Sequence, residues 1–239
     1  MIRSLLPDTR LDARGFRLRG TEVSRVEALS DAVFGFAITL LVVSLDVPRT
    51  YDELIGLMSG FFAFGATFAQ LLMIWHVHYT FFRRYGLQDF ITIVLNAVLL
   101  FVVVFYIYPL KFMFTVLFAI LGLGDGTGIS FGANNAVSVM VIYSLSVVVV
   151  YGVFLLMYLH AMRRRTALGL DALEVHLTRS SINYCMIWVG VGVVSILLAW
   201  LGGPRFVPLA GMSYALLGPL QAWNGFRGAR RAPVRLEPA

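Results

Sequence analysis

Six long apolar stretches, separated by short polar segments, are the feature that most constrains how this chain can fold. They run approximately over residues 28–47, 54–82, 91–120, 136–162, 182–201 and 206–223. A helix crosses the hydrocarbon core of a bilayer with roughly 20 mostly apolar residues, and its backbone hydrogen bonds are then satisfied internally. Because 59% of the residues are hydrophobic and only 13% are charged, little chain remains for a domain in water. The sequence therefore predicts an all-α integral membrane protein with six transmembrane helices.

The basic residues indicate how these helices are oriented. Sixteen of the nineteen Lys and Arg residues lie in the N-terminal residues up to Arg25, the loops at 83–84 and 163–179, and the tail from Arg227. The other side holds only Arg49, Lys111 and Arg205. Cytoplasmic loops carry the excess of positive charge, so both termini are expected in the cytoplasm. We divide the chain into a basic N-terminal segment (1–24), a six-helix domain (25–227) and a tail (228–239) that is expected to be disordered.

Motifs typical of other protein classes are missing from the sequence. No Thr-Val-Gly-Tyr-Gly filter is present, and no helix carries the regular arginines of a voltage sensor. No His-Glu-x-x-His, Gly-x-Ser-x-Gly or Walker motif is present, so neither an enzyme nor a cofactor is predicted. The net charge of +6 sits in loops and tails, where it indicates topology and not a nucleic-acid partner. The glycine-rich stretch 122–132 is predicted to be an outer loop, and Gly202-Gly203-Pro204 a tight hairpin turn.

The first apolar helix carries a narrow stripe of mostly large side chains. At 100° per residue, Thr39, Leu40 and Val43 lie within about 60° of Phe36, whereas Asp31 points about 140° away. Such a stripe can be an ordinary packing or lipid-facing surface. It can also line a pore as a hydrophobic constriction, with Thr39 supplying a ring of hydroxyls. Spacing alone leaves both interpretations open.

Residues of this helix also form a recognisable motif. Arg25-x-x-x-Leu29-Ser30-Asp31 resembles the Arg-x-x-x-Phe-Ser-Asp signature of the endosomal/lysosomal potassium channel family (transmembrane protein 175). Leu29 replaces the signature phenylalanine, which keeps an apolar contact but removes a ring from the packing. Bacterial members of this family carry one six-helix unit per chain, which agrees with the six stretches found here.

Two further motifs follow in the order found in that family. The second apolar stretch contains Trp75-x-x-His78-x-x-x-Phe82, which is similar to the family's Trp-x-x-His-x-x-x-Phe. The third contains Asn96 followed by Pro109, like the family's Asn…Pro pattern. The resemblance covers roughly residues 25–112, and beyond them only the number and length of the spans agree.

The resemblance implies a homotetramer in a bacterial plasma membrane, with the first helix of each subunit around a central pore. Carried over position by position, Phe36 forms the first apolar ring, Thr39 the hydroxyl layer, and Leu40 and Val43 further apolar rings. K+ is expected transiently near Thr39, and no fixed metal site is implied. Relatives usually have Ile or Leu at the position of Phe36, so a bulkier constriction is expected in this chain.

The same resemblance implies a buried polar network that fixes the first helix against its neighbours. An unpaired buried charge destabilises a fold by several kcal/mol even after relaxation. Asp31 therefore needs a partner, and Arg25 and His78 are the candidates that the motifs suggest. The implied network contains Arg25, Ser30, Asp31, Trp75, His78 and Asn96.

The leading hypothesis from the sequence is a potassium-permeable cation channel with a hydrophobic constriction instead of a carbonyl filter. Its expected partners are further copies of the chain, the lipid bilayer and K+ ions. One alternative is a proton leak or proton-coupled secondary transporter that uses Asp31 and His78 as a relay. Another is a non-conducting membrane scaffold, in which the stripe is only a subunit interface.

Overall fold

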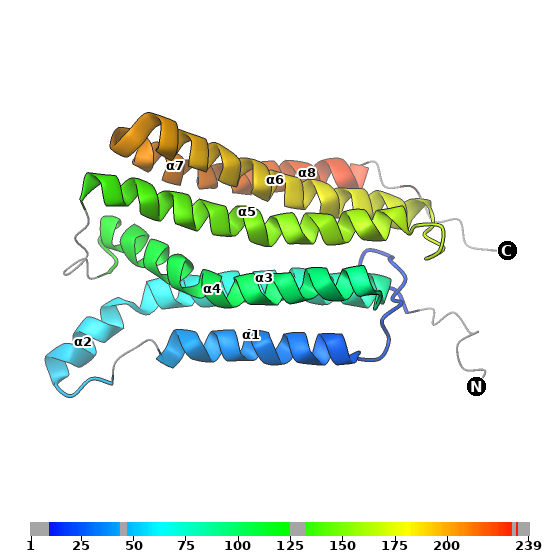
Figure 1. Ribbon diagram of the computed structural model, residues 1–239, viewed down its shortest axis with the longest axis horizontal. Helices are drawn as coiled ribbons and strands as arrows, with labels where there is room; N and C mark the ends of the chain where they lie inside the picture. The colour runs from blue at the N-terminus through cyan, green and yellow to red at the C-terminus, as the bar shows by residue number, and fades with distance from the viewer. Residues whose placement is uncertain (1–9, 44–46, 125–131, 231–232, 234–239) are drawn as a thin grey trace.

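A computed structural model shows an elongated bundle of long helices that run up and down (Figure 1). It describes residues 10–43, 47–124, 132–230 and 233. The helices pack through one main hydrophobic core, with α5 against α4 and α6, and α1 against α3 and α4. The elements are α1 (Arg25–Val43), α2 (Tyr51–Ser59), α3 (Phe61–Tyr85), α4 (Phe90–Ile120), α5 (Ala133–Arg163), α6 (Ala172–Gly202), η1 (Gly203–Phe206), α7 (Val207–Met212), η2 (Ser213–Leu216) and α8 (Leu217–Arg230).

The predicted all-helical membrane architecture is confirmed, although several helix boundaries differ. Within the described residues, five helical stretches are long and apolar enough to cross a membrane. The last of these, Ala172–Arg230, contains two of the six predicted spans, because it reverses direction after α6. The predicted span 54–82 is divided at Gly60 into α2 and α3, and the described part of the first helix runs to Val43, with Val47 outside it.

The reversal after α6 is the predicted hairpin at Gly202-Gly203-Pro204. Gly203 has φ 67°, which favours glycine, and a Cβ on Gly202 would lie only 2.4 Å from the Phe206 ring. The returning chain is less regular than the predicted span 206–223, since η1, α7 and η2 precede α8. Ser195 on α6 donates to the Ala210 carbonyl at 3.0 Å and so fixes this return. The glycine-rich loop prediction falls mainly on 125–131, outside the described residues.

Capping residues set the helix starts at one end of the bundle. Asp89 caps α4 by accepting from the Thr92 N–H, and it also contacts His160 on α5 at 2.7 Å. Burial raises the pKa of Asp89, but hydrogen bonds from Thr92 and His160 outweigh this effect and lower the pKa below its ordinary value. Asp171 and Glu174 form a reciprocal capping box at the start of α6. Asp89 therefore joins the start of α4 to the end of α5, while the capping box stabilises the start of α6.

The N-terminal segment, residues 10–24, folds across the same end. Phe16 is fully buried and packs edge-on against Tyr85, with the ring centroids 5.4 Å apart. The fully buried carboxylate of Glu174 accepts from Arg17 at 3.1 Å and from Arg19 at 2.7 Å. The sequence analysis interprets these arginines only as topology signals, and the structure shows that they also join the segment to α6.

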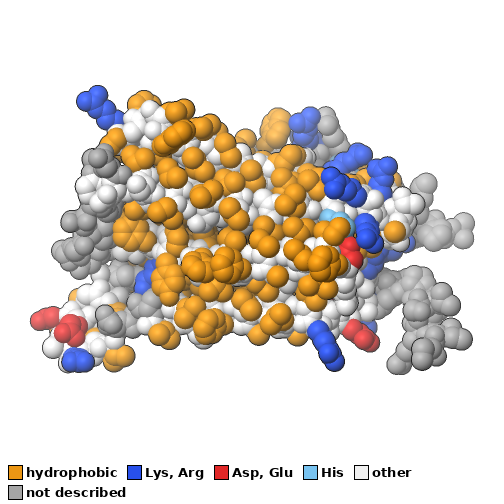
Figure 2. Space-filling model, viewed as in Figure 1, with side chains coloured by type: hydrophobic (Ala, Val, Ile, Leu, Met, Phe, Trp, Pro, Cys, Tyr) orange, Lys and Arg blue, Asp and Glu red, His pale blue; other side chains and the backbone are white. Residues whose placement is uncertain are grey.

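An ion pair joins this segment to the end of α3 as well. Arg84 donates to Asp12 at 2.7 Å. Burial raises the pKa of Asp12, but the Phe16 N–H and the charge of Arg84 outweigh it and lower the pKa below its ordinary value. Arginine side chains gather at this end of the visible face, and hydrophobic side chains cover its middle (Figure 2). The described chain begins and ends here, near Arg10 and Arg230 (Figure 1), and of the predicted tail, residues 228–230 belong to α8.

Candidate pore-lining face of the first helix

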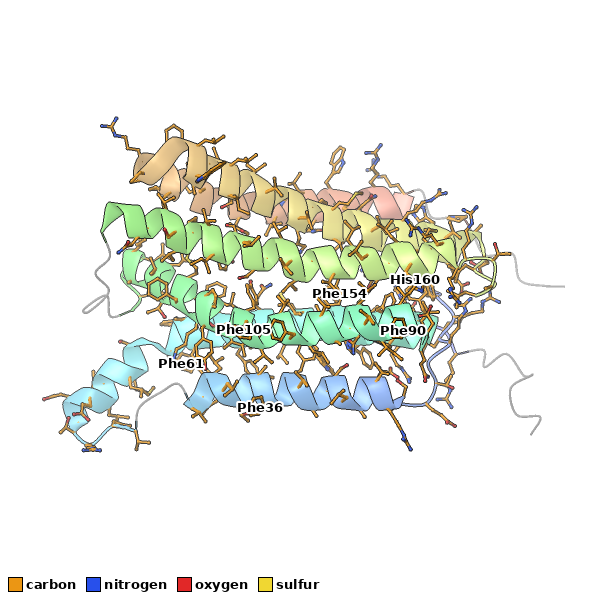
Figure 3. The ribbon with its side chains drawn as sticks, in the orientation of Figure 1. Phe36, Phe61, Phe90, Phe105, Phe154 and His160 are labelled. Atoms are coloured by element: carbon orange, nitrogen blue, oxygen red, sulfur yellow. The ribbon has the colours of Figure 1, made fainter. Side chains whose placement is uncertain are left out.

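Helix α1 lies at the edge of the bundle and has one packed side and one exposed side (Figure 3). Its packed side faces α3 and α4 and consists of Glu27, Ser30, Phe34, Ala37 and Leu41. We call the exposed side the open face and define it as Ala28, Leu29, Ala32, Gly35, Phe36, Thr39, Val42 and Val43. The helix is therefore anchored along one side only, which leaves an apolar surface for lipid or for another subunit.

The stripe predicted from sequence falls largely on the open face. Phe36 is 58% exposed and Val43 is 76% exposed, and Thr39 is exposed between them. Leu40 is only half-buried, because it packs partly against the main core. It lies about 40° from Phe36 on the side that turns toward the bundle. Three of the four predicted stripe residues thus share the open face, and Leu40 lies at its edge.

The hydroxyl of Thr39 is oriented by its own helix. Its Oγ1 donates to the carbonyl of Phe36 at 2.7 Å. The hydroxyl proton is therefore used inside the helix, and the oxygen lone pairs are free to accept. Among residues 32–43, Thr39 carries the one side-chain oxygen. A cation beside this stretch of α1 would find its side-chain ligand there.

Small residues on the open face were missed by the sequence interpretation. Ala28 and Ala32 are exposed and four residues apart, and a Cβ added to Gly35 would meet nothing within 4 Å. Small residues at this spacing allow helix backbones to approach closely in membranes. The pattern was visible in the sequence, but only the structure shows that it shares a face with Phe36.

Behind the open face, three buried polar side chains connect three helices. Ser30 on α1 donates to the Val26 carbonyl, so its oxygen accepts from Asn96 Nδ2 on α4 at 2.9 Å. Asn96 Oδ1 lies 2.9 Å from His78 Nε2 on α3 and must accept, because an amide oxygen carries no hydrogen. His78 therefore carries its proton on Nε2. We call this group the Ser30–Asn96–His78 chain.

The remaining residues of the implied network behave differently. Trp75 Nε1 donates to Asp31 Oδ1 at 2.8 Å, so Trp75 is the partner of Asp31. Asp31 itself is exposed in this single chain, and its bond to Trp75 is separate from the Ser30–Asn96–His78 chain. Arg25 is also exposed and contacts none of these groups within the described residues. In this single chain the residues of the expected network thus divide into a buried chain of three and a separate pair, and Arg25 bonds to neither.

The start of α1 is stabilised by a cap that the sequence analysis did not identify. Glu27 is buried and accepts from the Ser24 N–H at 2.8 Å, while Ser24 Oγ accepts from the Glu27 N–H at 3.2 Å. This reciprocal pair is a capping box, and its Ser-x-x-Glu pattern was available in the sequence. It explains how a carboxylate is accommodated on the packed side of α1.

Comparisons with known proteins place this arrangement in a family. A family model described as "Endosomal/lysosomal potassium channel TMEM175" matches residues 25–106, which contain α1, α2, α3 and the first half of α4. A potassium channel of Marivirga tractuosa is 38% identical over 215 residues, covering 86% of this chain and 87% of the relative. The potassium channel Cha6605_3372 of Chamaesiphon minutus is 36% identical over 97 residues, covering 37% of this chain and 48% of the relative.

Solved structures show the same similarity. A crystal structure of a variant of the potassium channel MtTMEM175, bound to a nanobody–MBP fusion, is 33% identical, with a TM-score of 0.80 over 93% of this chain and 100% of that chain. A lysosomal potassium-selective channel TMEM175 homologue from Chamaesiphon minutus is 24% identical, with a TM-score of 0.56 over 85% of this chain and 96% of that one. The second likeness concerns the fold alone. This chain therefore belongs to the TMEM175 family of potassium channels, and that family consists of ion channels and not of enzymes.

Proposed function

We propose that this chain is one subunit of a four-fold-symmetric, potassium-permeable channel whose pore is lined by the open face of α1. The observation that carries the proposal is the division of α1 into a packed side and an exposed apolar side with one hydroxyl. One narrow face cannot enclose a pore, so several copies must face a common axis. The names of the relatives, which are potassium channels, support K+ as the ion.

In this proposal the constriction consists of apolar rings and not of backbone carbonyls. Phe36 and Val43 of each subunit face the axis, Thr39 supplies hydroxyl oxygens between them, and Leu40 contacts the neighbouring α1 at the edge of the face. An apolar constriction passes ions only when it is wide enough to fill with water, so its width controls the conductance. Selectivity for K+ over Na+ is then modest, because four hydroxyls do not replace a full hydration shell.

The charge distribution supports the proposed membrane orientation. Sixteen of nineteen basic residues belong to the side that carries the N-terminal segment and the tail. The positive-inside rule assigns that side to the cytoplasm. We therefore propose a plasma-membrane protein with both termini in the cytoplasm and the Ser30–Asn96–His78 chain holding α1 in place.

A non-conducting scaffold is the second candidate, and the bulk of Phe36 favours it. Four phenylalanine rings on one axis would form a larger plug than smaller aliphatic side chains. A proton relay from Asp31 to His78 receives less support, because Asp31 bonds to Trp75 while His78 bonds to Asn96. These contacts leave the two ionisable groups in separate hydrogen-bonded units.

The test is the reversal potential of the purified protein in planar bilayers, with K+ on one side and Na+ on the other. A shift toward the K+ equilibrium potential supports a selective channel, and Phe36→Ala should then raise the conductance by widening the first ring. Val33→Ala is the control, because Val33 lies on the same helix but packs against the core. A change with Val33→Ala and none with Phe36→Ala would refute the assignment of the pore face.

The alternatives give different results in the same assay. Silence of both the wild type and Phe36→Ala would support the scaffold and reject the channel. A flux that depends on a proton gradient would support coupled transport instead.

A further inference from the structure

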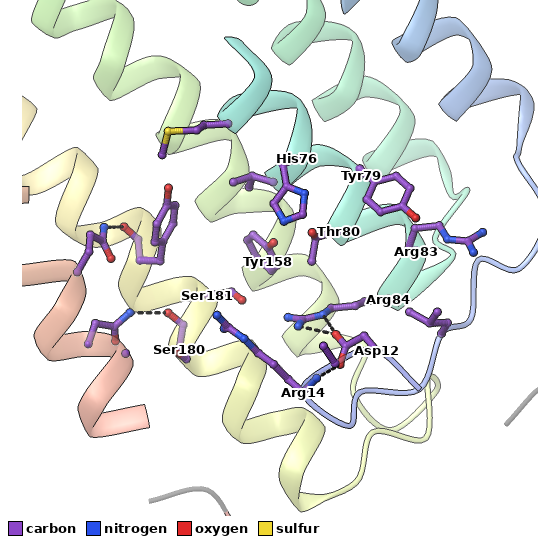
Figure 4. Close-up of a pocket in the computed structure, with 18 of the residues that line it drawn as sticks. Asp12, Arg14, His76, Tyr79, Thr80, Arg83, Arg84, Tyr158, Ser180 and Ser181 are labelled. Atoms are coloured by element: carbon purple, nitrogen blue, oxygen red, sulfur yellow. Dashed lines mark hydrogen bonds and ion pairs between the residues drawn. The ribbon is translucent and has the colours of Figure 1, made fainter. Parts of the chain in front are cut away.

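A large cavity opens at the arginine-rich end of the bundle, away from the open face of α1. It has a volume of about 740 Å³ and lies between the N-terminal segment, α3, α5, α6 and α8. Figure 4 shows His76 and Tyr79 of α3 above it, Ser180 and Ser181 of α6 beside it, and Arg14 reaching in from the N-terminal segment. The channel proposal assigns no role to this cavity.

One wall of the cavity carries positive charge that the protein does not neutralise. Arg84 is paired with Asp12 at 2.7 Å. Arg83 donates only to the carbonyl of Thr21, at 3.1 Å, and its buried Nε has no hydrogen-bond partner within the described residues. Arg14 is exposed, and in the described part of the chain no carboxylate pairs with its guanidinium. Within the described residues neither Arg14 nor Arg83 has a counter-ion, and Figure 4 shows Arg83 turned away from Arg14.

A second polar atom in the cavity wall also lacks a partner. Gln221 on α8 donates through Nε2 to the Tyr184 carbonyl at 3.1 Å, but its buried Oε1 accepts nothing in the described residues. Other atoms of the Gln221 and Arg83 side chains line the cavity, whereas Gln221 Oε1 and Arg83 Nε themselves are shielded from it. A bound ligand would therefore contact the exposed atoms of this wall.

The other wall of the cavity is apolar and extends into the bundle. Leu72, Met73 and Val77 of α3 line it. At 1.5 Å of rise per residue, the distance along α3 from Arg84 to Leu72 is about 18 Å. The cavity thus runs from the arginine-rich end, where the membrane surface is expected, toward the level of the hydrocarbon core. A free phosphate would occupy only its charged end and leave this wall uncovered.

We infer that this cavity binds an anionic phospholipid. The phosphate lies against Arg14, and one acyl chain follows Leu72, Met73 and Val77. Basic pockets between membrane helices are suited to acidic headgroups, and arginine matches phosphate with paired donors. A zwitterionic lipid would bring its own positive charge to this arginine-rich end and is therefore disfavoured. The inference stands independently of the proposed pore.

Lipid binding is measured by native mass spectrometry of the full-length protein titrated with phosphatidylglycerol, with phosphatidylcholine of the same chains, or with inorganic phosphate. We expect phosphatidylglycerol to bind more tightly than phosphatidylcholine. Each arginine near the headgroup contributes about 1 kcal/mol, so Arg14→Ala should weaken phosphatidylglycerol binding about fivefold. Arg163→Ala is the charge-matched control, because Arg163 is exposed at the end of α5 and outside the cavity. Equal loss in both variants would overturn the site.

The proposed binding of an acyl chain along the apolar wall is tested separately. Met73→Trp fills the apolar end of the cavity and should weaken phosphatidylglycerol binding, whereas Leu156→Trp, on an exposed position of α5, should not. Competition by inorganic phosphate as effective as by lipid would mean an anion site and overturn the lipid assignment. If Met73→Trp changes the oligomeric mass and leaves lipid binding intact, a second copy of the chain covers the cavity and the inference is wrong. None of these readouts requires ion current, so they remain informative if the channel proposal fails.

Discussion

The packing of α1 is tested most directly at Asn96, because its amide joins three helices. It donates to Ser30 and accepts from His78, each at 2.9 Å, and all three side chains are buried. Asn96→Leu keeps the branching of the side chain but removes both bonds and leaves the His78 N–H without an acceptor. Hydrogen bonds in membrane proteins contribute about 0.6 to 1.7 kcal/mol, and an unsatisfied buried donor costs about 1–3 kcal/mol. We expect the free energy of unfolding to fall by about 2–3 kcal/mol.

The assay is unfolding by SDS in mixed micelles, followed by tryptophan fluorescence. Asn183→Leu is the matched control, since Asn183 is exposed on α6, and it should change the free energy of unfolding by less than about 0.5 kcal/mol. The double variant Asn96→Leu/His78→Phe also removes the His78 N–H that Asn96→Leu leaves without an acceptor. It should therefore be no less stable than Asn96→Leu alone. If the losses of the two single variants simply add, the two side chains are not coupled and the reasoning is refuted.

Three further predictions concern assembly, the N-terminal segment and pH. Val43→Cys should form disulfide-linked dimers under mild oxidation, because the open faces meet around the axis in the proposed assembly. Native Cys185 is buried, and Leu156→Cys, at an exposed position of α5, should not crosslink. Glu174→Gln should lower the free energy of unfolding by about 3 kcal/mol in the SDS assay, because Arg17 and Arg19 would then share one neutral amide oxygen in place of a carboxylate. Because the pKa of Asp12 is lowered in the folded state, its contribution is complete above the ordinary aspartate pKa of about 4 and is lost as pH falls through the lowered value. Thermal unfolding of Asp12→Asn should therefore depend less on pH in this acidic range than that of the wild type, and equal slopes would contradict the assignment.

Hydropathy was sufficient to predict the helical membrane fold, but not where every helix begins and ends. The apolar run 54–82 is continuous, and Gly60 has an ordinary αR conformation with φ −78°, so the break between α2 and α3 has no strong local signal. The pairing of Arg17 and Arg19 with Glu174 joins positions more than 150 residues apart. Charge patterning reports the side of the membrane and contains no information on such distant partners. The capping boxes, in contrast, are local and could have been identified from sequence.

For the candidate site, the helical wheel predicted how the residues of α1 are placed relative to one another, but not which side of the helix is buried. It separated Asp31 from Phe36, and the resemblance then suggested that Asp31 is buried. In the structure the packed side of α1 is centred on Phe34 and Ala37, so Asp31 falls just outside it and bonds to Trp75. Which side of a helix is buried depends on the neighbours that pack against it, and a single helix sequence does not specify them.

The two sides of α1 also impose different requirements on its residues. The packed side must hold the helix rigidly, and the Ser30–Asn96–His78 chain does so with directional bonds inside the protein. The open face cannot use such bonds before assembly, so it relies on shape: Ala32 and Gly35 permit close approach, while Phe36 projects beyond them. In the proposed channel, assembly and constriction are then properties of one surface. The width at Phe36 would be set by how closely the small residues allow neighbouring helices to approach, because the packed side prevents each α1 from adjusting alone.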